Sequence, residues 1–393
     1  MTHPALADGP IYLDYNATTP VDPRVTEAMT PYLTTFFGNP SSSHAYGADP
    51  QAALAAARAQ VAALIGARPS EVVFTGSGSE ANLLALRGVV LASGRPRPHV
   101  ITQATEHPAI LETCRALQRL HGVRVTVLPV DADGLVDPAA LVDALDDDTV
   151  LVSIMAANNE TGALQPIAEL TELAHRHGAL FHSDAAQAAG KVPVAVDQLG
   201  VDLLTVVGHK MYAPKSTAAL YVRGGVQLEP VVYGGGQERG LRAGTENVAL
   251  AVALGTAAEL AVDELAGGRA DELAQLRDLL RERLSDALPG RVHLNGPESA
   301  RLPNTLNVSI DRTRGHELLA AATGVAASNG SACHSGTHTP SPVLSAMGLD
   351  HERALAAVRL SLGRWSRREE IETAAAAITK AATALQRPHN AQP

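Results

Sequence analysis

Two apolar stretches of this chain each end in one ionisable side chain. Residues 179–184 read Ala-Leu-Phe-His-Ser-Asp and end at Asp184, and residues 201–210 end at Lys210. Both patterns predict short buried strands that open into polar residues. A lysine can bind pyridoxal phosphate (PLP) covalently, and a carboxylate can keep the pyridine nitrogen protonated so that the ring accepts electrons. Together, Asp184 and Lys210 would therefore supply what this cofactor needs.

A glycine-rich turn at residues 75–80 reads Thr-Gly-Ser-Gly-Ser-Glu and lies between a strand pattern and a helix pattern. Such a turn offers free N–H groups and the positive end of a helix dipole to a phosphate. Gly78 and Ser79 are the candidate ligands, and Ser79 is also the expected N-cap. The G-x-G-x-x-A spelling of 76–81 resembles a dinucleotide fingerprint, but residues 94–101 lack the acid that this fingerprint needs. An ordinary strand–helix turn stays an alternative.

Further polar residues follow other predicted strands. His107 comes after residues 98–102, where an imidazole could stack on a flat cofactor or shuttle protons. A plain surface histidine is the alternative there. Asn159 can offer an amide to a ring oxygen or a substrate carboxylate. Gln187 follows the acidic strand by three residues, and His209, next to the lysine, could reach a cofactor phosphate.

The two cysteines lie in different contexts. Cys114 is part of an apolar helical pattern, which indicates a structural role, whereas Cys333 lies in the polar, glycine-containing segment 328–336. A cysteine in an exposed loop can ionise and act as a nucleophile. The Cys-His-x-x-x-His pattern that ends at His338 lacks a fourth ligand, so we predict no metal site. Arg359 interrupts an apolar run, and its anionic partner is either a substrate carboxylate or a structural acid.

The composition indicates a globular enzyme. At 393 residues the chain can form two domains, and 46% hydrophobic with 18% charged residues is ordinary for a folded protein. A net charge of −10 argues against direct nucleic-acid binding. We expect no membrane segment, because no apolar run is long enough, and we expect a cytoplasmic location, because the N-terminus lacks signal-peptide features. Two cysteines suit a reducing compartment.

Strand and helix patterns alternate from about residue 50 to 260, which predicts a mostly parallel sheet with helices on both faces. The strands are expected at 71–75, 98–102, 123–128, 149–155, 178–183, 201–207 and 217–222. Helices are expected at 50–66, 79–93, 108–121, 138–145 and 166–177. Ligands bind at the carboxyl ends of such strands, where Asp184 and Lys210 fall.

A long helical pattern at 246–287 is expected to contain the domain junction. The C-terminal region is predicted as strands within 291–310, a helix at 315–323, a polar loop at 326–341 and two closing helices. We therefore predict a large PLP-binding domain at 17–263. A smaller α+β domain, formed by 1–16 and 264–393, would carry the cysteine loop 326–341.

Taken together, these segments resemble the cysteine desulfurases of the NifS/IscS group, in the class V branch of PLP enzymes with the aspartate aminotransferase-like fold. The resemblance runs nearly end to end. It rests on residues 12–20, 37–40, 105–107, 153–155, 158–160, 182–184, 208–210, 234–245, 330–333 and 359–363. The spacing from Cys333 to 341–344 is similar to the long cysteine loop of the first desulfurase group.

The resemblance implies a role for each site residue. Lys210 would hold PLP and move the Cα proton of L-cysteine. Asp184 would pair with the pyridine nitrogen, and Gln187 would contact the ring hydroxyl. His107 would stack on the ring and assist proton transfer. Cys333, as a thiolate, would attack the substrate sulfur, leaving alanine and an enzyme persulfide for a sulfur-acceptor protein.

The resemblance also implies which residues bind the phosphate of PLP and the carboxylate of the substrate. Ser79, His209 and the amide of Gly78 would hold the phosphate, and Thr245 would reach it across the interface of a homodimer. Asn159, next to the cofactor, and Arg359 would bind the substrate carboxylate.

The chain departs from the family pattern in two places. Val207 stands where a phosphate-binding serine is usual, and residues 213–216 read Ala-Pro-Lys-Ser instead of Gly-Pro-Lys-Gly. A lost hydroxyl removes about 1–3 kcal/mol of hydrogen bonding to a charged group, so either PLP binds more weakly or Thr205 compensates. The chain ends without the longer tail that scaffold-binding members use. This departure argues against delivery to an iron–sulfur scaffold. Iron–sulfur assembly, tRNA thiolation and DNA phosphorothioation are nevertheless all destinations of the sulfur in desulfurases of this type, and the sequence does not choose among them.

Three alternative functions remain at this stage. Selenocysteine lyase chemistry is close, since selenium leaves more easily. A PLP aminotransferase would need Lys210 and Asp184 but no cysteine. A non-enzymatic partner subunit is motivated only by Val207 and the altered segment 213–216.

Overall fold

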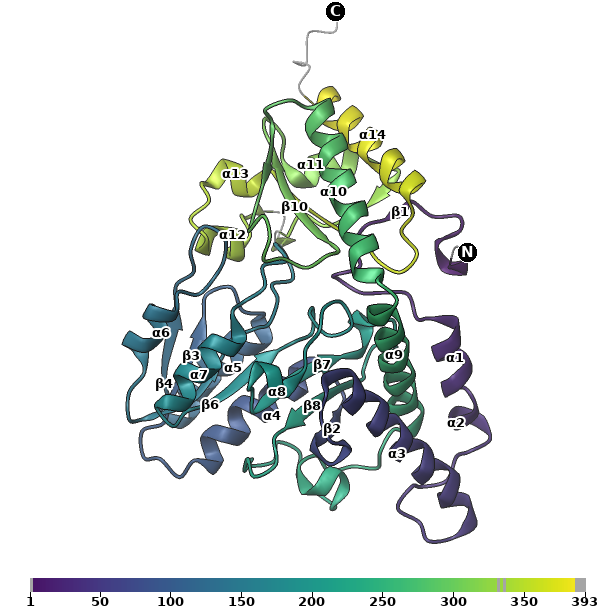
Figure 1. Cartoon of the computed structure of the whole chain (residues 1–393), viewed down its shortest axis with the longest axis vertical. Coiled ribbons are helices and arrows are strands. Elements are labelled where there is room, and N and C mark those ends of the chain that lie inside the picture. Colours follow the sequence, from purple (N-terminus) through teal and green to yellow (C-terminus); the bar gives the residue numbers. More distant parts are fainter. Residues whose placement is uncertain (1–2, 331–332, 335–336, 386–393) are drawn as a thin grey trace, which may run out of the picture.

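The computed structural model describes residues 3–330, 333–334 and 337–385, and for 333–334 and 337–338 it describes the backbone alone. The chain forms two lobes stacked along its long axis, as Figure 1 shows. The lower lobe is built on a seven-stranded sheet and the upper lobe on a three-stranded sheet. Among the described ranges, no helix is both long and apolar enough to cross a membrane.

The large sheet is mostly parallel, as the alternating pattern predicts. In spatial order its strands are β2 (Val72–Thr75), β8 (Ala218–Val222), β7 (Leu203–Val207), β6 (Leu180–Asp184), β5 (Thr149–Ser153), β3 (His99–Gln103) and β4 (Arg124–Leu128). Only β8 runs antiparallel to its neighbours β2 and β7. Because β8 is reversed, its first residues lie beside the carboxyl ends of the parallel strands.

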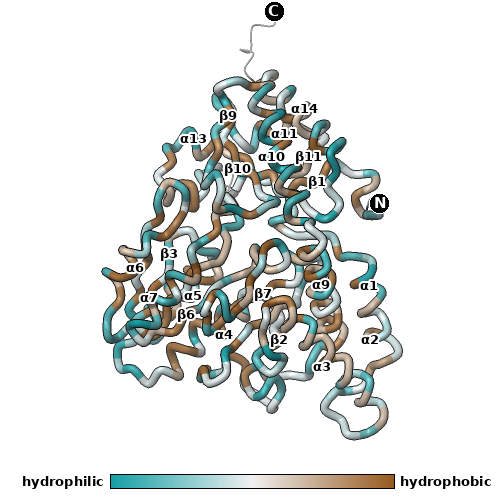
Figure 2. The backbone as a smooth tube through the Cα atoms, viewed as in Figure 1, coloured by the Kyte–Doolittle hydropathy of each residue, from teal (hydrophilic) through white to brown (hydrophobic). Residues whose placement is uncertain are grey.

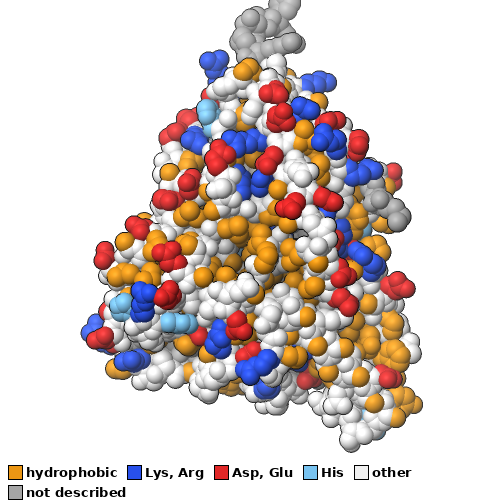
Figure 3. All heavy atoms as spheres, viewed as in Figure 1, with side chains coloured by type: hydrophobic (Ala, Val, Ile, Leu, Met, Phe, Trp, Pro, Cys, Tyr) orange, Lys and Arg blue, Asp and Glu red, His pale blue; other side chains and the backbone are white. Residues whose placement is uncertain are grey.

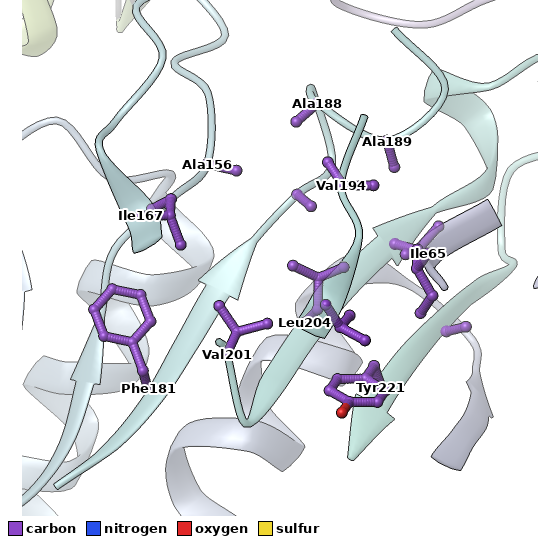
Figure 4. Close-up of a cluster of buried hydrophobic side chains, with 14 of the residues drawn as sticks. Ile65, Ala156, Ile167, Phe181, Ala188, Ala189, Val194, Val201, Leu204 and Tyr221 are labelled. Carbon is purple, nitrogen blue, oxygen red and sulfur yellow. The ribbon is translucent and has the colours of Figure 1, made fainter. Parts of the chain in front are cut away.

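Helices cover both faces of this sheet and bury two apolar clusters. One face packs against α4 (Gly78–Ala92) and α5 (Pro108–His121). The other packs against α3 (Ala45–Ile65), α6 (Pro138–Ala144), α7 (Ile167–Arg176) and α9 (Val248–Ala266). Figure 4 shows part of the second cluster, in which Leu204 and Tyr221 lie on the side of Ile65 of α3, and Phe181 of the next strand lies near Ile167 of α7. The inner strands β5 and β7 are buried along their whole length, and Figure 2 shows brown, hydrophobic stretches in this part of the lower lobe.

Shorter helices complete the lower lobe. They are α1 (Pro23–Met29), α2 (Pro31–Thr34) and α8 (Val196–Leu199), with 3-10 turns at Pro69–Glu71, Gly208–Lys210 and Gln237–Gly240. The turn Gly208–Lys210 directly follows β7 and carries the predicted cofactor lysine out of the sheet.

The upper lobe has its own apolar core, and both described ends of the chain belong to it. Strand β10 (Thr305–Ile310) pairs antiparallel with β9 (Val292–Leu294) and β14 (Ala357–Ser361), and β1 (Ile11–Tyr12) pairs parallel with β11 (Val325–Ala326). Its helices are α10 (Arg269–Ala287), α11 (Gly315–Ala321), α12 (Pro342–Ala346), α13 (His351–Leu355) and α14 (Arg368–Ala384). A 3-10 turn at Pro4–Leu6 precedes β1, and the backbones of β12 (Cys333–His334) and β13 (Thr337–His338) pair within the predicted cysteine loop.

Two expectations for the C-terminal half are wrong in detail. The helical pattern 246–287 is two helices, because Gly268 adopts a left-handed φ of +79° between α9 and α10. The region expected to hold two closing helices contains three and the strand β14. Every residue of β14 is buried, so it lacks the alternation by which a half-buried strand is recognised. The domain limits 17–263 and 264–393 stay a prediction; α9 packs in the lower core and α10 in the upper.

Candidate active site

A cavity of about 570 Å³ lies at the carboxyl ends of the parallel strands. Most site residues predicted from the sequence line it: Gly78, Ser79, His107, Asn159, Asp184, Gln187, His209, Lys210 and Arg359. Thr245 is exposed and does not line this cavity. The side chain of Cys333 lies outside the part of the chain that the structure describes. Figure 3 shows hydrophobic side chains gathering across the waist between the two lobes, below a surface of mixed charges.

Lys210 enters the cavity from the turn after β7. Its Nζ donates to the backbone oxygens of Asn16 and Ala17, each at 2.7 Å. Burial, together with the nearby Arg359 guanidinium, lowers the pKa of Lys210 to about 8, against the opposing effect of acidic neighbours. A lysine with this pKa has a sizeable neutral fraction near neutral pH, so its amine can act as a nucleophile or a base.

Asp184 ends β6 and is 6% exposed. Its Oδ2 accepts a hydrogen bond of 2.7 Å from Asn82 Nδ2, and its Oδ1 accepts one of 2.9 Å from the Ala186 N–H. Each carboxylate oxygen can accept a further bond. The carboxylate is therefore held in one orientation and still has room for a ring N–H.

Gln187 and the half-buried Lys191 meet at the segment that follows β1. Gln187 Nε2 donates to the Asn16 carbonyl at 2.9 Å, and Gln187 Oε1 accepts from Lys191 Nζ at 2.6 Å. Burial lowers the pKa of Lys191. Asn16 also receives bonds from Asn304 and donates to Thr305 of the upper lobe. One asparagine thus joins Lys210 and Gln187 to the three-stranded sheet.

His107 is the N-cap of α5 as well as a cavity residue. Its Nδ1 accepts the Ala109 N–H at 3.1 Å, so the neutral ring carries its proton on Nε2. Reduced hydration in the cavity and the charge of Lys210 lower the pKa of His107, while Asp184 opposes this. The preceding Glu106 is buried, and this burial raises its pKa to about 8.

The glycine-rich turn before α4 forms the opposite end of the cavity. The N-cap of α4 is Ser77, whose Oγ accepts the Glu80 N–H at 3.1 Å, so the expectation that Ser79 caps this helix is wrong. The helix begins one residue earlier than expected, at Gly78, and this leaves the Ser79 hydroxyl in the cavity. A Cβ on Gly78 would lie 2.6 Å from Val207 Cγ2, so β7 and this turn approach as closely as a glycine allows.

His209 and the glycine-rich segment 234–245 border the same end. Burial, with nearby positive charges, lowers the pKa of His209 to about 4, and its Nδ1 lies 3.2 Å from Thr18 Oγ1. In segment 234–245, Arg242 Nε donates to Glu80 at 2.8 Å, and Glu80 in turn accepts the Gly76 N–H at 2.9 Å. The segment is therefore docked against the turn before α4.

For Arg359 the sequence leaves two anionic partners open, a structural acid and a substrate carboxylate, and the structure has room for both. Its Nη2 contacts Asp14 Oδ1 at 2.7 Å, so a structural ion pair is present. Its Nη1 donates to the Asn159 carbonyl at 3.2 Å, and its Nε is buried without a partner among the described residues. Because Arg359 and Asn159 also line the cavity, this guanidinium can still receive an anion there.

Glu160 connects the cavity wall to both ends of the loop 326–341. It is 8% exposed, and burial raises its pKa. Its Oε2 accepts from Ser341 Oγ at 2.6 Å, and the same oxygen would lie 2.6 Å from a Cβ on Gly330. Ser328, just before Gly330, exchanges backbone hydrogen bonds with Arg359.

Sequence reasoning assigned no role to four residues of this network, Asp14, Asn16, Asn82 and Glu160, although the segments 12–20 and 158–160 belong to the resemblance. Asn82 had a local signal, because an asparagine on the apolar face of a helix needs a buried partner. For Asp14 and Asn16 we find no local signal, since the partners of their side chains lie more than 140 positions away. Cys114 is buried as predicted, and burial raises the pKa of its thiol to about 12, which makes it unreactive.

The residues present fit pyridoxal phosphate. The cavity contains a lysine and a fixed carboxylate, and its other end is the start of helix α4, whose free N–H groups can receive a phosphate. Among the described residues, no group of His, Cys, Asp or Glu could hold a metal ion. The side chains of Cys333, His334 and His338 lie outside the described part of the chain.

Comparison with known proteins agrees with this geometry. Residues 11–373 match the family model described as aminotransferase class-V. The mitochondrial cysteine desulfurase of Drosophila melanogaster is 47% identical over 366 residues, covering 92% of this chain and 79% of that protein. The cysteine desulfurase IscS of Dictyoglomus turgidum is 46% identical over 367 residues, covering 92% of this chain and 91% of that protein.

Solved structures show the same fold. A NifS-like protein superimposes with a TM-score of 0.88 at 37% identity, over 95% of this chain and 99% of that chain. The resemblance, the α/β transferase fold and the PLP cofactor predicted from the sequence are thereby confirmed. The chain belongs to the PLP-dependent aminotransferase class-V family and, within it, to the cysteine desulfurases of the NifS/IscS group.

Proposed function

We propose that the protein is a PLP-dependent cysteine desulfurase that converts L-cysteine to L-alanine and passes the sulfur to an acceptor protein. One observation carries this proposal. A lysine of lowered pKa, a fixed carboxylate and a buried arginine line one cavity, in a chain whose relatives are named cysteine desulfurases.

The proton transfers fall to Lys210 and His107. When bound, PLP supplies an electron sink that acidifies the Cα proton of the substrate. Lys210, with a pKa of about 8, can accept and return a proton near neutral pH. His107 presents Nε2 to the cavity because its Nδ1 is engaged by the helix that it caps. The carboxylate of Asp184 is the partner for the pyridine nitrogen, and Gln187 for the ring hydroxyl.

The substrate carboxylate is assigned to Arg359 and Asn159. Arg359 pairs with Asp14 and lines the cavity together with Asn159. A substrate carboxylate would bind the part of this guanidinium that faces the cavity. Since Asp14 is partly exposed, with 23% of its side-chain surface accessible, it can yield its place to the incoming anion.

The sulfur transfer is assigned to Cys333. Its thiolate attacks the substrate sulfur, and the bond between Cβ and sulfur breaks with its electron pair left on the carbon side. Protonation of that carbon gives alanine. The net change is one L-cysteine and one thiol to one L-alanine and one persulfide, with no external oxidant. Glu160 supports this role, because it contacts both ends of the segment that carries Cys333.

A homodimer is part of the proposal, with Thr245 contributing to the phosphate site of the second copy. Thr245 is exposed, on a segment docked beside the cavity. Phe37 and Tyr46 are 72% and 68% exposed and stack at 5.5 Å, and they offer an apolar surface to a partner. Sedimentation should give twice the chain mass of 40.8 kDa, and a monomer at micromolar concentration would contradict the assignment.

We place the reaction in the cytoplasm. A reducing compartment suits the free thiol of Cys114 and keeps the Cys333 thiol available between turnovers.

The decisive experiment incubates purified protein with PLP, L-cysteine and a thiol reductant, and measures alanine and sulfide. Wild type should form both in equal amounts, and Cys333→Ser should form neither. Cys114→Ala is the matched control. It should keep the activity, since Cys114 is buried in α5, where only 2% of its surface is exposed. Cysteine turnover unchanged in Cys333→Ser would assign the cavity to another PLP reaction, such as transamination.

A further inference from the structure

At the end of the cavity proposed for the phosphate, the family resemblance leads us to expect a serine hydroxyl where this chain has Val207. Val207 is the last residue of β7 and lines the cavity there, with its Cγ2 methyl against Gly78. The expectation that Thr205 compensates is not supported by the geometry. Thr205 is fully buried, does not line the cavity and engages His182 Nε2 at 3.1 Å. A hydroxyl that takes the place of the one expected at position 207 must therefore come from an element other than β7.

The reversed strand β8 brings a different serine to this place. Val207 pairs with Ala218, and the Gly208 N–H donates to the Thr217 carbonyl at 3.0 Å. Ser216, one residue earlier, therefore lies beside the residues that follow β7. It lines the same cavity as Val207, His209 and Gly78, and it is exposed to it.

Of the other hydroxyls at this end, that of Ser79 also lines the cavity and is already assigned to the phosphate, whereas those of Ser77 and Thr217 have protein partners. Ser77 Oγ caps α4 by accepting the Glu80 N–H, and Thr217 Oγ1 donates to the Leu250 carbonyl at 3.2 Å. No hydrogen bond of the Ser216 hydroxyl is found within the described ranges. Lys215, next to it, also lines the cavity and adds positive charge there. The free hydroxyl thus lies where an anion is favoured.

The backbone of Ser216 is also unusual. Its φ is +66°, in the left-handed region that glycine adopts without steric cost and that other residues rarely adopt. A serine there carries a conformational cost that a glycine would avoid. Such costs occur mainly at binding and catalytic sites.

We propose that Ser216 is a phosphate ligand of PLP in this protein and takes over the hydrogen bond that Val207 cannot make. The hydroxyl group is thus supplied by the loop before β8 and not by the last residue of β7. Because β8 is antiparallel, both positions lie at the same end of the cavity.

The test compares PLP with pyridoxal, which has the same ring and aldehyde but no phosphate. Cofactor-free wild type, Ser216→Ala and Ser216→Gly are titrated with each compound, and binding is followed by the absorbance of the bound chromophore. Both variants should bind PLP about 10- to 100-fold more weakly, the usual range for one hydrogen bond to a charged group, and should bind pyridoxal as wild type does.

Ser216→Gly separates the hydroxyl from the backbone conformation. It removes the positive-φ cost, so the cofactor-free variant should be at least as thermostable as wild type while still losing PLP affinity. PLP binding within twofold of wild type in both variants would overturn the proposal. So would an equal loss for PLP and pyridoxal, because the effect would then not involve the phosphate.

Discussion

Because Gly78 lies close to Val207, the structure predicts how Gly78→Ala changes the stability of the protein. An ideal Cβ on Gly78 would lie 2.6 Å from Val207 Cγ2, but 3.8 Å from both Val207 Cβ and Cγ1. Carbon atoms pack at about 3.5–4.0 Å, so Gly78→Ala forces a displacement of about 1 Å at a single methyl group. Removing that methyl by Val207→Ala should remove the conflict.

The magnitudes follow from the packing. Overpacking of this kind costs about 1–3 kcal/mol, so Gly78→Ala should lower the stability by that amount. Val207→Ala alone should also cost about 1–3 kcal/mol, since two buried methyl groups are lost. In the Val207→Ala background, adding Gly78→Ala should cost close to nothing, because the remaining contact is ordinary. The coupling between the two changes is therefore about 1–3 kcal/mol in favour of the double variant.

The assay is thermal unfolding of the four cofactor-free proteins, followed by circular dichroism. About 1 kcal/mol corresponds to roughly 2–4 °C for a domain of 150–250 residues, so the expected differences are measurable. The midpoint of the double variant should match that of Val207→Ala. If Gly78→Ala lowers the midpoint equally in both backgrounds, the contact between these two residues does not account for the glycine.

Three further predictions concern buried polar groups. Ser341→Ala should lower stability by about 1–3 kcal/mol, because it removes both the α12 cap and the partner of Glu160; an unchanged unfolding midpoint would contradict this. In the cofactor-free protein the pKa of Lys210 is lowered to about 8, so between that pH and the unfolded value of 10.5 only the unfolded chain holds the proton and stability should rise with pH. Lys210→Met should flatten this rise in unfolding experiments from pH 7.5 to 9.5, and an equal slope in both proteins would refute the assignment. Arg364→Leu should cost about 3–5 kcal/mol in chemical unfolding, because two carboxylates, one of them Asp22, lose a buried partner. The Arg24 and Arg364 side chains hold the pKa of Asp22 below its usual value. The stability that ionised Asp22 contributes is therefore present above pH 3.8 and lost on acidification. Because Arg364→Leu removes one of these two partners, this variant should lose less stability in acid than wild type.

The local pattern of the chain was enough to place the chemistry at one edge of a sheet. Asp184 and Lys210 follow apolar runs, and consecutive parallel strands bring their carboxyl ends together without any knowledge of distant contacts. The same reasoning failed where burial hides periodicity, as at β14, and where two serines compete for one cap, as at Ser77 and Ser79.

The tertiary structure alone decided which distant residues complete the site. Asn16 and Asp14 meet Lys210 and Arg359 across 194 and 345 positions of chain. The strand and helix periodicities of the sequence, 2 and 3.6 residues, do not predict such a contact, because it depends on how the upper lobe packs on the lower one. The position of Ser216 beside Val207 likewise depends on the antiparallel direction of β8. The residue types of the site are thus determined by the sequence, whereas their partners follow from long-range packing.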